Sequence, residues 1–596
     1  MSPTPHPSRR FGYSWLWVLL PLCWTLWLSW KGTPNFPHAD HWALESTMLL
    51  ADADGTLNWG TMAEQMNDSR YLLPRVCHLL LARATHWNLQ IEAAVCVLMG
   101  GGIAILTWWC VRRSLAGRTA DGVAAGLSLL ILSPHQTMNW NFGVQICYFL
   151  TVATGLGITA VFLTRWSLAR QTAAGILTAT AGAWSFAPGW LAWGLVIWGV
   201  LGWVRRSRAL ALATALLTVL AAIGLNAWIY FSGYAFQEGI PLSQKLLTQW
   251  HGILLYFMNT LGAPFAEGWL QSNNAGRARM QDLLAPLLSG ILLLWLAALA
   301  LWHRRDLLRR TGSTPSWMWA GLAGWSLLLT AVVSLARTGN TLSNAFASRY
   351  IAFTIWAWAA ALILTFMLPP GRKRRYLLVP MTLLLLWGWL AGALTGVKQF
   401  QKDRYTMRLL QGALTMSAVA PEPLGLRGND PMMHLILPRV ERLDELGYLH
   451  PRLVRSQLVA DAGVQESDLI EGKILDIAPG PPLRISGYAI DYRRHGPADS
   501  IVLSYQEAGG EEIWWTPITA RVMEKSLKKK ANAKGLEGED ARIGWVWEGG
   551  QKSSHYKTVT PPARPCTIRA YALDGITGTF YRLKGSLPLH APQPVD

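Results

Sequence analysis

The first two thirds of the chain alternate between long apolar runs and short polar connections. A helix needs roughly 20 apolar residues to cross a membrane, and about eleven runs approach that length. They are Ser14–Trp30, Ile91–Val111, Ala120–Leu132, Gln145–Leu163, Ala173–Ala187, Gly189–Val204, Ala209–Phe231, Leu283–Trp302, Ser316–Ala336, Ile351–Met367 and Tyr376–Leu394. The pattern predicts an α-helical polytopic membrane domain over residues 1–397, with a helical external loop at 31–90.

The pattern changes after Lys398. Residues 398–482 are predicted to be an amphipathic segment followed by a Pro- and Gly-rich linker. From Leu483 onward apolar and polar residues alternate with a period of two, which is typical of half-buried strands. The clearest of these stretches are Arg484–Asp491, Ser500–Tyr505 and Thr567–Asp574. They predict a small antiparallel β-sandwich over residues 483–590.

Two local features of this C-terminal region have alternative interpretations. Its paired tryptophans, Trp514-Trp515 and Trp545/Trp547, are expected in the sandwich core, although such rings also stack on sugars. The lysine-rich run Lys525–Lys534 is expected to be a solvated loop.

Composition agrees with a membrane protein, since 51% of the 596 residues are hydrophobic and 15% are charged. The net charge of +18 does not indicate nucleic-acid binding, because many basic residues form short clusters between the apolar runs. These clusters are Arg9-Arg10, Arg112-Arg113 with Arg118, Arg165 with Arg170, Arg205-Arg206, Arg304–Arg310 and Arg372–Arg375. The 33 Trp residues fit the aromatic belts at the two membrane–water interfaces.

None of the six cysteines forms a Cys-x-x-Cys pair, so neither a zinc site nor a redox motif is visible.

The basic clusters predict the orientation of the spans. If Arg9-Arg10 is cytoplasmic, the positive-inside rule places every cluster on that side. The loops 31–90, 133–144, 232–282 and 337–350, and everything after Lys398, are then external. We therefore expect a multi-pass protein of the cytoplasmic membrane, with a cytoplasmic N-terminus and an external C-terminal domain. The first run lacks a small-residue cleavage site, which favours a retained span over a signal peptide.

Asp40 is the leading candidate for chemistry, because it follows the first apolar run and faces the outer surface in this topology. The same external loop contains Asp68, Arg70 and Arg75. A carboxylate at the membrane surface can accept a proton from a hydroxyl, and arginines can neutralise a phosphate.

The second external turn concentrates four side-chain amides: Gln136, Asn139, Asn141 and Gln145. Carboxamides suit sugar hydroxyls because each can both donate and accept a hydrogen bond. The alternative is that they satisfy backbone groups in a tight interhelical turn.

A third external feature is Arg349-Tyr350 at the start of a span. An arginine on the external side is an exception to the positive-inside rule, which places basic residues on the cytoplasmic side. It either snorkels to headgroups or binds an anion, and the planar guanidinium favours the anion.

Together these features suit sugar transfer from a lipid-phosphate donor. In that chemistry Asp40 deprotonates the acceptor hydroxyl while Arg70, Arg75 and Arg349 hold the departing phosphate. Such a donor needs no nucleotide, which agrees with the lack of a Walker or Gly-x-Gly-x-x-Gly motif.

On these residues the region from Ser14 to Leu394 resembles a bacterial branch of the GT-C superfamily of membrane glycosyltransferases, which use polyprenyl-phosphate sugars. The resemblance implies an inverting enzyme with Asp40 as its base and a cell-envelope glycan or glycolipid as acceptor. Substrate contacts are expected from His38, His41, Asp68, Gln136, Asn139, Asn141, Gln145 and Tyr350. The start of the C-terminal sandwich resembles modules attached to bacterial cell-surface glycan enzymes.

The chain departs from the family pattern at two positions. Ser69 stands where the branch carries a histidine, and His41 stands where many members carry a second acid. No cofactor is predicted with certainty. A divalent metal bound by His38, Asp40 and His41 stays an open alternative.

Three other functions stay open at this point. They are a transporter or flippase of lipid-linked glycans, a polymerase or ligase of such glycans, and a non-catalytic envelope assembly protein. A transport path usually carries ionisable residues near the membrane midplane, and the apolar runs are almost free of them. Membrane lipids, the donor and the acceptor are the expected partners, and nucleic acid is not.

Overall fold

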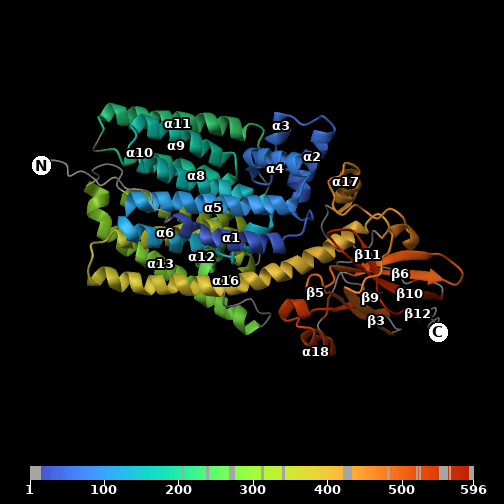
Figure 1. Cartoon of the computed structure of the whole chain (residues 1–596). Helices are drawn as coiled ribbons and strands as arrows, with labels where there is room; N and C mark the ends of the chain where they lie inside the picture. The colour runs from blue at the N-terminus through green and yellow to red at the C-terminus, as the bar shows by residue number, and fades with distance from the viewer. Residues whose placement is uncertain are drawn as a thin grey trace. The chain divides into compact units, whose positions relative to one another are not determined.

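The protein is described by a computed structural model (Figure 1). The described residues are 15–204, 207–235, 241–266, 275–309, 315–338, 342–420, 433–478, 483–518, 521–522, 525–549, 562 and 565–589. The chain divides into two compact units, which we treat separately. The helical unit comprises Met1–Trp30, Leu57–Leu80 and Gln90–Gln399. The sheet unit comprises Lys31–Thr56, Leu81–Leu89 and Phe400–Asp596.

Helices make up most of the helical unit. They are α1 (Trp15–Gly32), α3 (Trp59–Met62), α4 (Leu72–Thr85), α5 (Leu89–Ser114), α6 (Gly117–Ile131), α7 (Thr137–Asn141), α8 (Ile146–Leu163), α9 (Leu168–Ala183), α10 (Ala192–Leu201), α11 (Ala209–Phe231), α12 (Leu242–Ala266), α13 (Ala275–Arg309), α14 (Pro315–Arg337), α15 (Ile351–Phe366) and α16 (Arg372–Thr415). Short 3₁₀ turns η2 (Gly143–Gln145), η3 (Ala187–Leu191), η5 (Leu342–Phe346) and η6 (Ser348–Tyr350) connect some of them. A two-strand hairpin pairs β1 (Gln65–Met66) with β2 (Ser69–Arg70).

Each predicted apolar run forms helix in the described part of the chain. Among the described residues, seven helical stretches are long and apolar enough to cross a membrane, by length and composition. The other runs form the shorter helices α6, α9 and α10 and the tryptophan-rich α1. The predicted multi-pass helical domain is therefore confirmed. One expectation differs, because α12 is a 25-residue helix in a stretch expected to be an external loop.

Successive long helices of this unit run in alternating directions, and Figure 1 shows the polypeptide turning back at the two ends of the bundle. At one end of the bundle, residues that neighbour the predicted basic clusters in the sequence contact one another. There the rings of Trp198 and Trp317 stack with centroids 3.8 Å apart, and each indole donates to the other's carbonyl at 2.8 Å. Trp319 also donates to Ser114 at 2.8 Å. We call this end the basic end.

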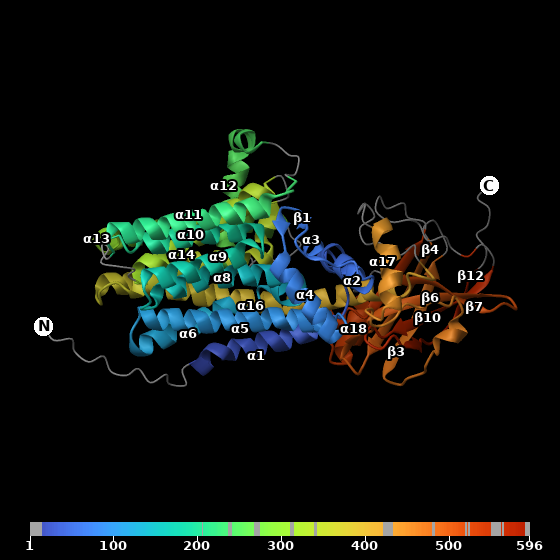
Figure 2. The ribbon, with the colours of Figure 1, turned by 90° about the horizontal axis from the view of Figure 1, so that it is seen from above.

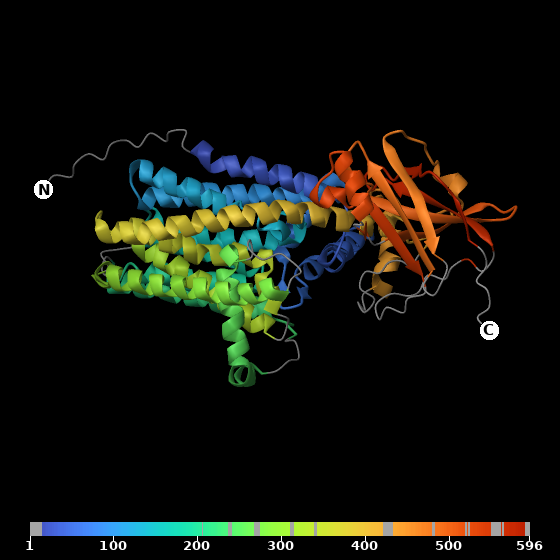
Figure 3. The same ribbon diagram turned by 90° about the horizontal axis from the view of Figure 1, so that it is seen from below.

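Glycines let the membrane helices approach closely. A Cβ on Gly155 of α8 would lie 2.5 Å from the ring of Trp325 on α14. A Cβ on Gly262 of α12 would lie 2.2 Å from the backbone oxygen of Ala285 on α13. Small residues at such crossings are characteristic of helix packing in membranes. The C-terminal half of α12 is buried in this way, whereas its N-terminal half is largely exposed and projects from the bundle (Figures 2 and 3).

The sheet unit contains two antiparallel sheets. The first has the order β11-β10-β6-β7, with β12 also pairing β10, and the second has the order β3-β4-β9-β8, with β5 also pairing β4. The strands are β3 (Ile470–Ala478), β4 (Leu483–Asp491), β5 (Gly496–Pro497), β6 (Ser500–Glu507), β7 (Glu512–Ile518), β8 (Arg521–Val522), β9 (Gly544–Gly549), β10 (Cys566–Leu573), β11 (Phe580–Arg582) and β12 (Leu587–Leu589). Period-two alternation thus produced the predicted β region, although β3 precedes Leu483.

Apolar side chains from the two sheets form one core, which includes Ile485, Leu503 and Ile568. Trp515, Trp545 and Trp547 lie in this core, as expected, whereas Trp514 is buried in a separate cluster with Met416, Tyr571 and Phe580. The lysine-rich run is not a loop. It forms α18 (Lys525–Ala533), because Leu527 and Ala531 pack inward while Lys530 binds Glu471 at 2.6 Å.

Helices and irregular segments also belong to the sheet unit. They include the π-helical turn η1 (His41–Glu45), α2 (Ser46–Ala53), the last part of α16, α17 (Met433–Glu445), and the 3₁₀ turns η7 (Val459–Ala462) and η8 (Gly538–Ala541). Arg439 of α17 donates to the carbonyl of Trp42 at 3.0 Å. The segment that contains Asp40 therefore packs with the residues that follow Phe400, although it lies near the N-terminus.

Within the sheet unit, a buried network of acids and arginines joins the last part of α16 to the sheets. Arg408 of α16 and Arg494 both donate to the buried Asp499. Arg494 also binds Asp574 at 2.6 Å, and Arg493 binds Asp491 at 2.7 Å. Burial opposes ionisation of Asp499, but Arg408 and Arg494 outweigh it and lower its pKa to about 2. The carboxylate is therefore charged and fully paired at neutral pH.

Candidate functional site

Arg349 lies in η6, immediately before the first turn of α15. Hydrogen bonds from the short helix α7 hold this turn in place. Ser348 Oγ accepts a hydrogen bond from the Met138 backbone N–H at 3.1 Å, and Asn139 Nδ2 donates to the carbonyl of Ser348 at 3.3 Å. The guanidinium therefore stands at the N-terminal end of a membrane helix, where backbone N–H groups and the helix dipole favour a negative charge.

Phenol rings surround this guanidinium. Its carbon lies 5.0 Å from the centroid of the Tyr350 ring, and Nη2 donates to the Tyr350 hydroxyl at 3.3 Å. Tyr148 and Tyr256 both lie within electrostatic reach of Arg349. Arginine and phenol O–H groups are all donors to anionic oxygen. We call Arg349, Tyr350, Tyr148 and Tyr256 the Arg349 cluster.

Stacked aromatic rings extend the Arg349 cluster toward the hairpin. Tyr148 stacks on Phe353 with ring centroids 4.9 Å apart, and it contacts Phe186 at 5.0 Å. Tyr71 stacks on Phe186 from the other side at 5.9 Å. The rings form a continuous packed row from Phe353 of α15 to Tyr71, the residue that follows β2.

Of the two roles considered for the amide-rich turn, the structure shows the satisfaction of backbone groups, and sugar recognition stays a prediction. Gln136 donates to the carbonyls of Leu130 and Ile131 at 3.3 and 2.9 Å, so it satisfies the end of α6. Its own oxygen accepts from Asn139 at 3.0 Å. By contrast, Asn139 Oδ1 and Gln145 Oε1 are buried acceptors for which the described residues provide no donor. Asn141, at the end of α7, is half-buried.

Arg70 and Arg75 bind backbone carbonyls around the hairpin. Arg70 donates to the carbonyls of Tyr230, Ala63 and Ser232 at 2.6 to 2.7 Å, which ties β2 to the end of α11. Arg75 is buried, and its Nη1 donates to the carbonyls of Thr61, Met62 and Glu64 at 2.8 to 3.2 Å, close to the end of α3.

The hairpin turn borders a wide polar recess. Asp68 is exposed beside Asn67 in the two-residue turn, and Asn67 adopts a positive φ of 52°. The recess has a volume of about 620 Å³ and is lined by residues that include Glu64, Asn67, Arg70 and Ser232. Ser69, which replaces the expected histidine, is buried and accepts a hydrogen bond from the Ala187 N–H at 3.0 Å. Its role in this structure is to position η3.

Asp40 belongs to the sheet unit and is exposed at the start of η1. Ala39, just before it, has a positive φ of 47°, which is costly for a residue with a Cβ. The π-helical turn that follows is itself a rare conformation. Strained backbone and π-turns both occur preferentially at functional sites. Both unusual conformations flank Asp40, whose own backbone is helical, and its catalytic role stays a prediction.

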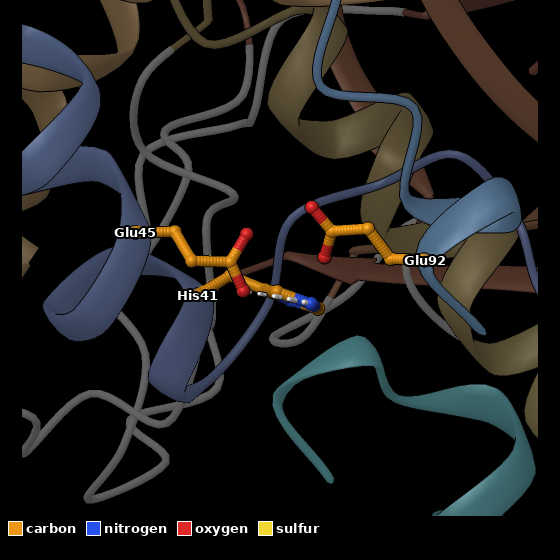
Figure 4. Close-up of side chains that lie close together, drawn as sticks. All are labelled: His41, Glu45 and Glu92. Atoms are coloured by element: carbon orange, nitrogen blue, oxygen red, sulfur yellow. Dashed lines mark ion pairs between the residues drawn. The ribbon is translucent and has the colours of Figure 1, made fainter. Parts of the chain in front are cut away.

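The π-helical turn places His41 beside Glu45, as Figure 4 shows. Both are buried, and His41 Nε2 lies 3.8 Å from Glu45 Oε1. The indole of Trp87 donates to the other carboxylate oxygen at 2.7 Å. The nitrogen and the carboxylate are two donors of the kind that bind a divalent cation. His38 Nδ1 instead lies 3.1 Å from the Phe36 carbonyl. Burial lowers the pKa of His38, with partial compensation from that carbonyl, so it is uncharged at neutral pH.

Sequence reasoning missed several members of these groups. The His41/Glu45 spacing of four residues is a helical signal that could have identified Glu45. Tyr148 and Tyr256 lie within apolar helices, and nothing in their spacing connects them to Arg349. A buried pair between His78 of α4 and Glu92 of α5, 3.3 Å apart, was also unforeseen.

The predicted site residues thus form three groups. Arg349, Tyr350 and Asn139 lie together, with Gln136 behind Asn139. Asp68, Arg70 and Arg75 surround the hairpin of the same helical unit. His38, Asp40 and His41 share one turn of the sheet unit.

No protein-family model and no curated protein matches the chain. Among solved structures, the chain is similar to the oligosaccharyltransferase of Archaeoglobus fulgidus tethered to an acceptor peptide, with 14% identity and a TM-score of 0.35. It is also similar to the archaeal oligosaccharyltransferase AglB from Archaeoglobus fulgidus in complex with an inhibitory peptide and a dolichol-phosphate, with 13% identity and a TM-score of 0.35. Each match covers 74% of this chain and 60% of the other.

Proposed function

We propose that the protein transfers a sugar from a polyprenyl-phosphate donor to a cell-envelope glycan or lipid acceptor at the outer face of the cytoplasmic membrane. Arg349 binds the donor phosphate, and Asp40 acts as the general base in a single inverting displacement. The acceptor hydroxyl attacks the anomeric carbon, the bond from that carbon to the phosphate oxygen breaks, and Asp40 takes the hydroxyl proton.

The Arg349 cluster is the observation that carries this proposal. It combines a guanidinium, several phenol hydroxyls and the N-terminus of a membrane helix, all of which stabilise a phosphate. The surrounding helices are apolar, as an isoprenoid tail requires. Asn139 Oδ1 and Gln145 Oε1 add buried acceptors suited to sugar hydroxyls. A site for a phosphate, a lipid tail and a sugar matches a polyprenyl-phosphate sugar better than a soluble nucleotide donor.

Arg70, Arg75 and Arg349 differ in their hydrogen-bond partners. Arg70 and Arg75 each bind three backbone carbonyls, and a phosphate would have to compete with those contacts. Arg349 donates to the Tyr350 hydroxyl, and that hydroxyl can itself donate to the same phosphate. We therefore assign the phosphate to Arg349 and a supporting structural role to the other two.

The test is binding of undecaprenyl phosphate to the purified full-length protein in nanodiscs. We expect Arg349→Gln to weaken binding at least tenfold, because a charge-assisted bidentate pair is lost. Arg165→Gln is the matched control, since Arg165 is an exposed arginine that follows the C-terminal end of α8. Its affinity should equal that of the wild type.

Equal affinity of the Arg349→Gln and wild-type proteins, with equal melting temperatures, would show that the phosphate does not bind here. Arg349→Lys keeps the positive charge but removes the planar guanidinium, so it separates the contribution of charge from that of hydrogen-bond geometry. It should recover only part of the affinity, because an ammonium cannot make the two parallel hydrogen bonds of a guanidinium.

A further inference from the structure

An apolar cavity lies in the helical unit, between α6, α15 and α16. Its volume is about 130 Å³ and it is partly open to the surroundings. Residues that define it are Gly122 and Gly126 of α6, Leu362 and Phe366 of α15, and Leu385 and Trp389 of α16. Apart from Thr382 and Trp389, the lining side chains carry no polar atoms. The occupant that suits such a lining is a hydrocarbon chain.

The two glycines form the wall of the cavity on α6. They are one helical turn apart and therefore share a face of the helix. A Cβ built on either of them meets no other atom within 4 Å. This distinguishes them from the interface glycines such as Gly155 and Gly262, where a Cβ would collide with a neighbouring helix. Their small size leaves space open beside α6.

Cations stand at the end of this cavity that lies toward the basic end. The guanidinium carbon of Arg374 lies 5.3 Å from the ring centroid of Phe366, which lines the cavity. Arg118 precedes Gly122 by one turn of α6, so it lies on the same helix face and is exposed. Arg372 and Arg375 are also exposed in the first turn of α16. An apolar groove thus adjoins a cluster of arginines.

We propose that this groove is a binding site for one anionic phospholipid of the leaflet on the basic side. An acyl chain lies along Gly122 and Gly126, and the phosphate binds Arg374 and Arg118. Basic pockets between transmembrane helices recognise anionic headgroups, and arginine suits phosphate. The site is distinct from the Arg349 cluster, which precedes α15, whereas Phe366 ends that helix. The inference does not depend on the proposed sugar transfer.

The test uses the purified full-length protein and native mass spectrometry with phosphatidylglycerol and phosphatidylcholine as probes. We expect the wild type to retain one phosphatidylglycerol with at least tenfold preference over phosphatidylcholine. Gly126→Leu should lower its retention at least tenfold by filling the groove. Gly102→Leu is the matched control, because a Cβ at this exposed α5 glycine also meets nothing within 4 Å. Arg374→Gln should abolish the preference for the anionic lipid.

Equal retention of the two lipids by the wild type would overturn the proposal, as would unchanged phosphatidylglycerol binding in Gly126→Leu. Displacement of phosphatidylglycerol by an equal concentration of undecaprenyl phosphate would also overturn it, since the groove would then belong to the donor lipid. If Gly126→Leu does not fold, Arg374→Gln decides, because a retained preference in that variant contradicts the assignment.

Discussion

Three arginines that look equivalent in the sequence have different surroundings in the fold. Arg70 and Arg75 fill the carbonyl-rich ends of short elements, whereas Arg349 lies among phenols at a helix N-terminus. The difference matters for interpreting mutations, because loss of a structural arginine and loss of a phosphate ligand both reduce activity. Stability measurements separate the two.

Arg75→Ala should destabilise the helical unit. The substitution removes a charged donor from three backbone carbonyls around the buried end of α3. Hydrogen bonds to charged groups contribute about 1.5–3 kcal/mol each, and the two hydrogens of Nη1 serve the three carbonyls, so we expect a loss of about 3–6 kcal/mol. The melting temperature of the detergent-solubilised protein should fall clearly, while Arg349→Ala should leave it nearly unchanged. A fall of equal size in both variants would contradict the distinction.

Asp499→Asn should destabilise the sheet unit by about 3–5 kcal/mol, because it leaves Arg408 and Arg494 buried without their shared carboxylate. Asp468→Asn, at an exposed acid of the same unit, should change stability by less than about 0.5 kcal/mol. Hydrogen exchange of β6 and β10 measures both effects. Similar exchange rates in the two variants would show that the network is not stabilising.

The same carboxylate also predicts a pH dependence. Since the folded pKa of Asp499 is about 2 and lies below its unfolded value, its stabilisation is present above about pH 4. It is lost as the pH falls from about 4 toward 2, and it amounts to about 2 kcal/mol. The protection factors of the sheet-unit amides, corrected for the intrinsic exchange rate at each pH, should therefore fall over this range in the wild type, and less in Asp499→Asn.

At the level of elements, glycine spacing decides how closely the membrane helices pack. Gly262→Ala should lower the melting temperature, because its Cβ would lie 2.2 Å from the carbonyl oxygen of Ala285. Overpacking of this kind costs about 1–3 kcal/mol. Gly102→Ala should be neutral or slightly stabilising, since alanine favours a helix and the site is open. If both variants melt at the wild-type temperature, the α12–α13 crossing is looser than described.

The elements also show where sequence patterns succeed. Apolar runs predicted helices and period-two alternation predicted strands, because burial of one face or of a whole segment dominates local preference. The apolar pattern failed to predict helices in segments that combine buried apolar residues with charged or polar ones. α12 begins with polar and aromatic residues that conceal its apolar C-terminal half. Lys525–Lys534 reads as a solvated run, yet Leu527 and Ala531 provide enough apolar spacing for α18.

For the whole molecule, the sequence predicted the order of a membrane region and a β region but not how one loop is shared between them. Residues 31–56 and 81–89 pack in the sheet unit, and residues 57–80 pack in the helical unit. Such long-range contacts leave no periodic signal. The segment 40–45 is a clear example, because Trp87 donates to Glu45 and Arg439 donates to the carbonyl of Trp42.

The predicted orientation of the whole molecule is tested by cysteine labelling in intact cells. A cysteine at Lys529 should react with a membrane-impermeant maleimide, whereas one at Arg165 should react only after permeabilisation. Both substitutions are made in a background without the six native cysteines. Equal labelling of the two positions in intact cells would contradict an external sheet unit.

The central claim is that Asp40 is the base of a sugar transfer, and mass spectrometry of cell-envelope glycans tests it most directly. The measurement compares strains that express the wild type, Asp40→Asn or the exposed-acid control Asp468→Asn at equal protein levels. We predict that Asp40→Asn loses the transferred sugar, with a rate at least about 100-fold lower, because general-base catalysis contributes that much. Asp468→Asn should retain the wild-type glycan. An Asp40→Asn strain whose glycans have the wild-type mass and abundance would contradict the account.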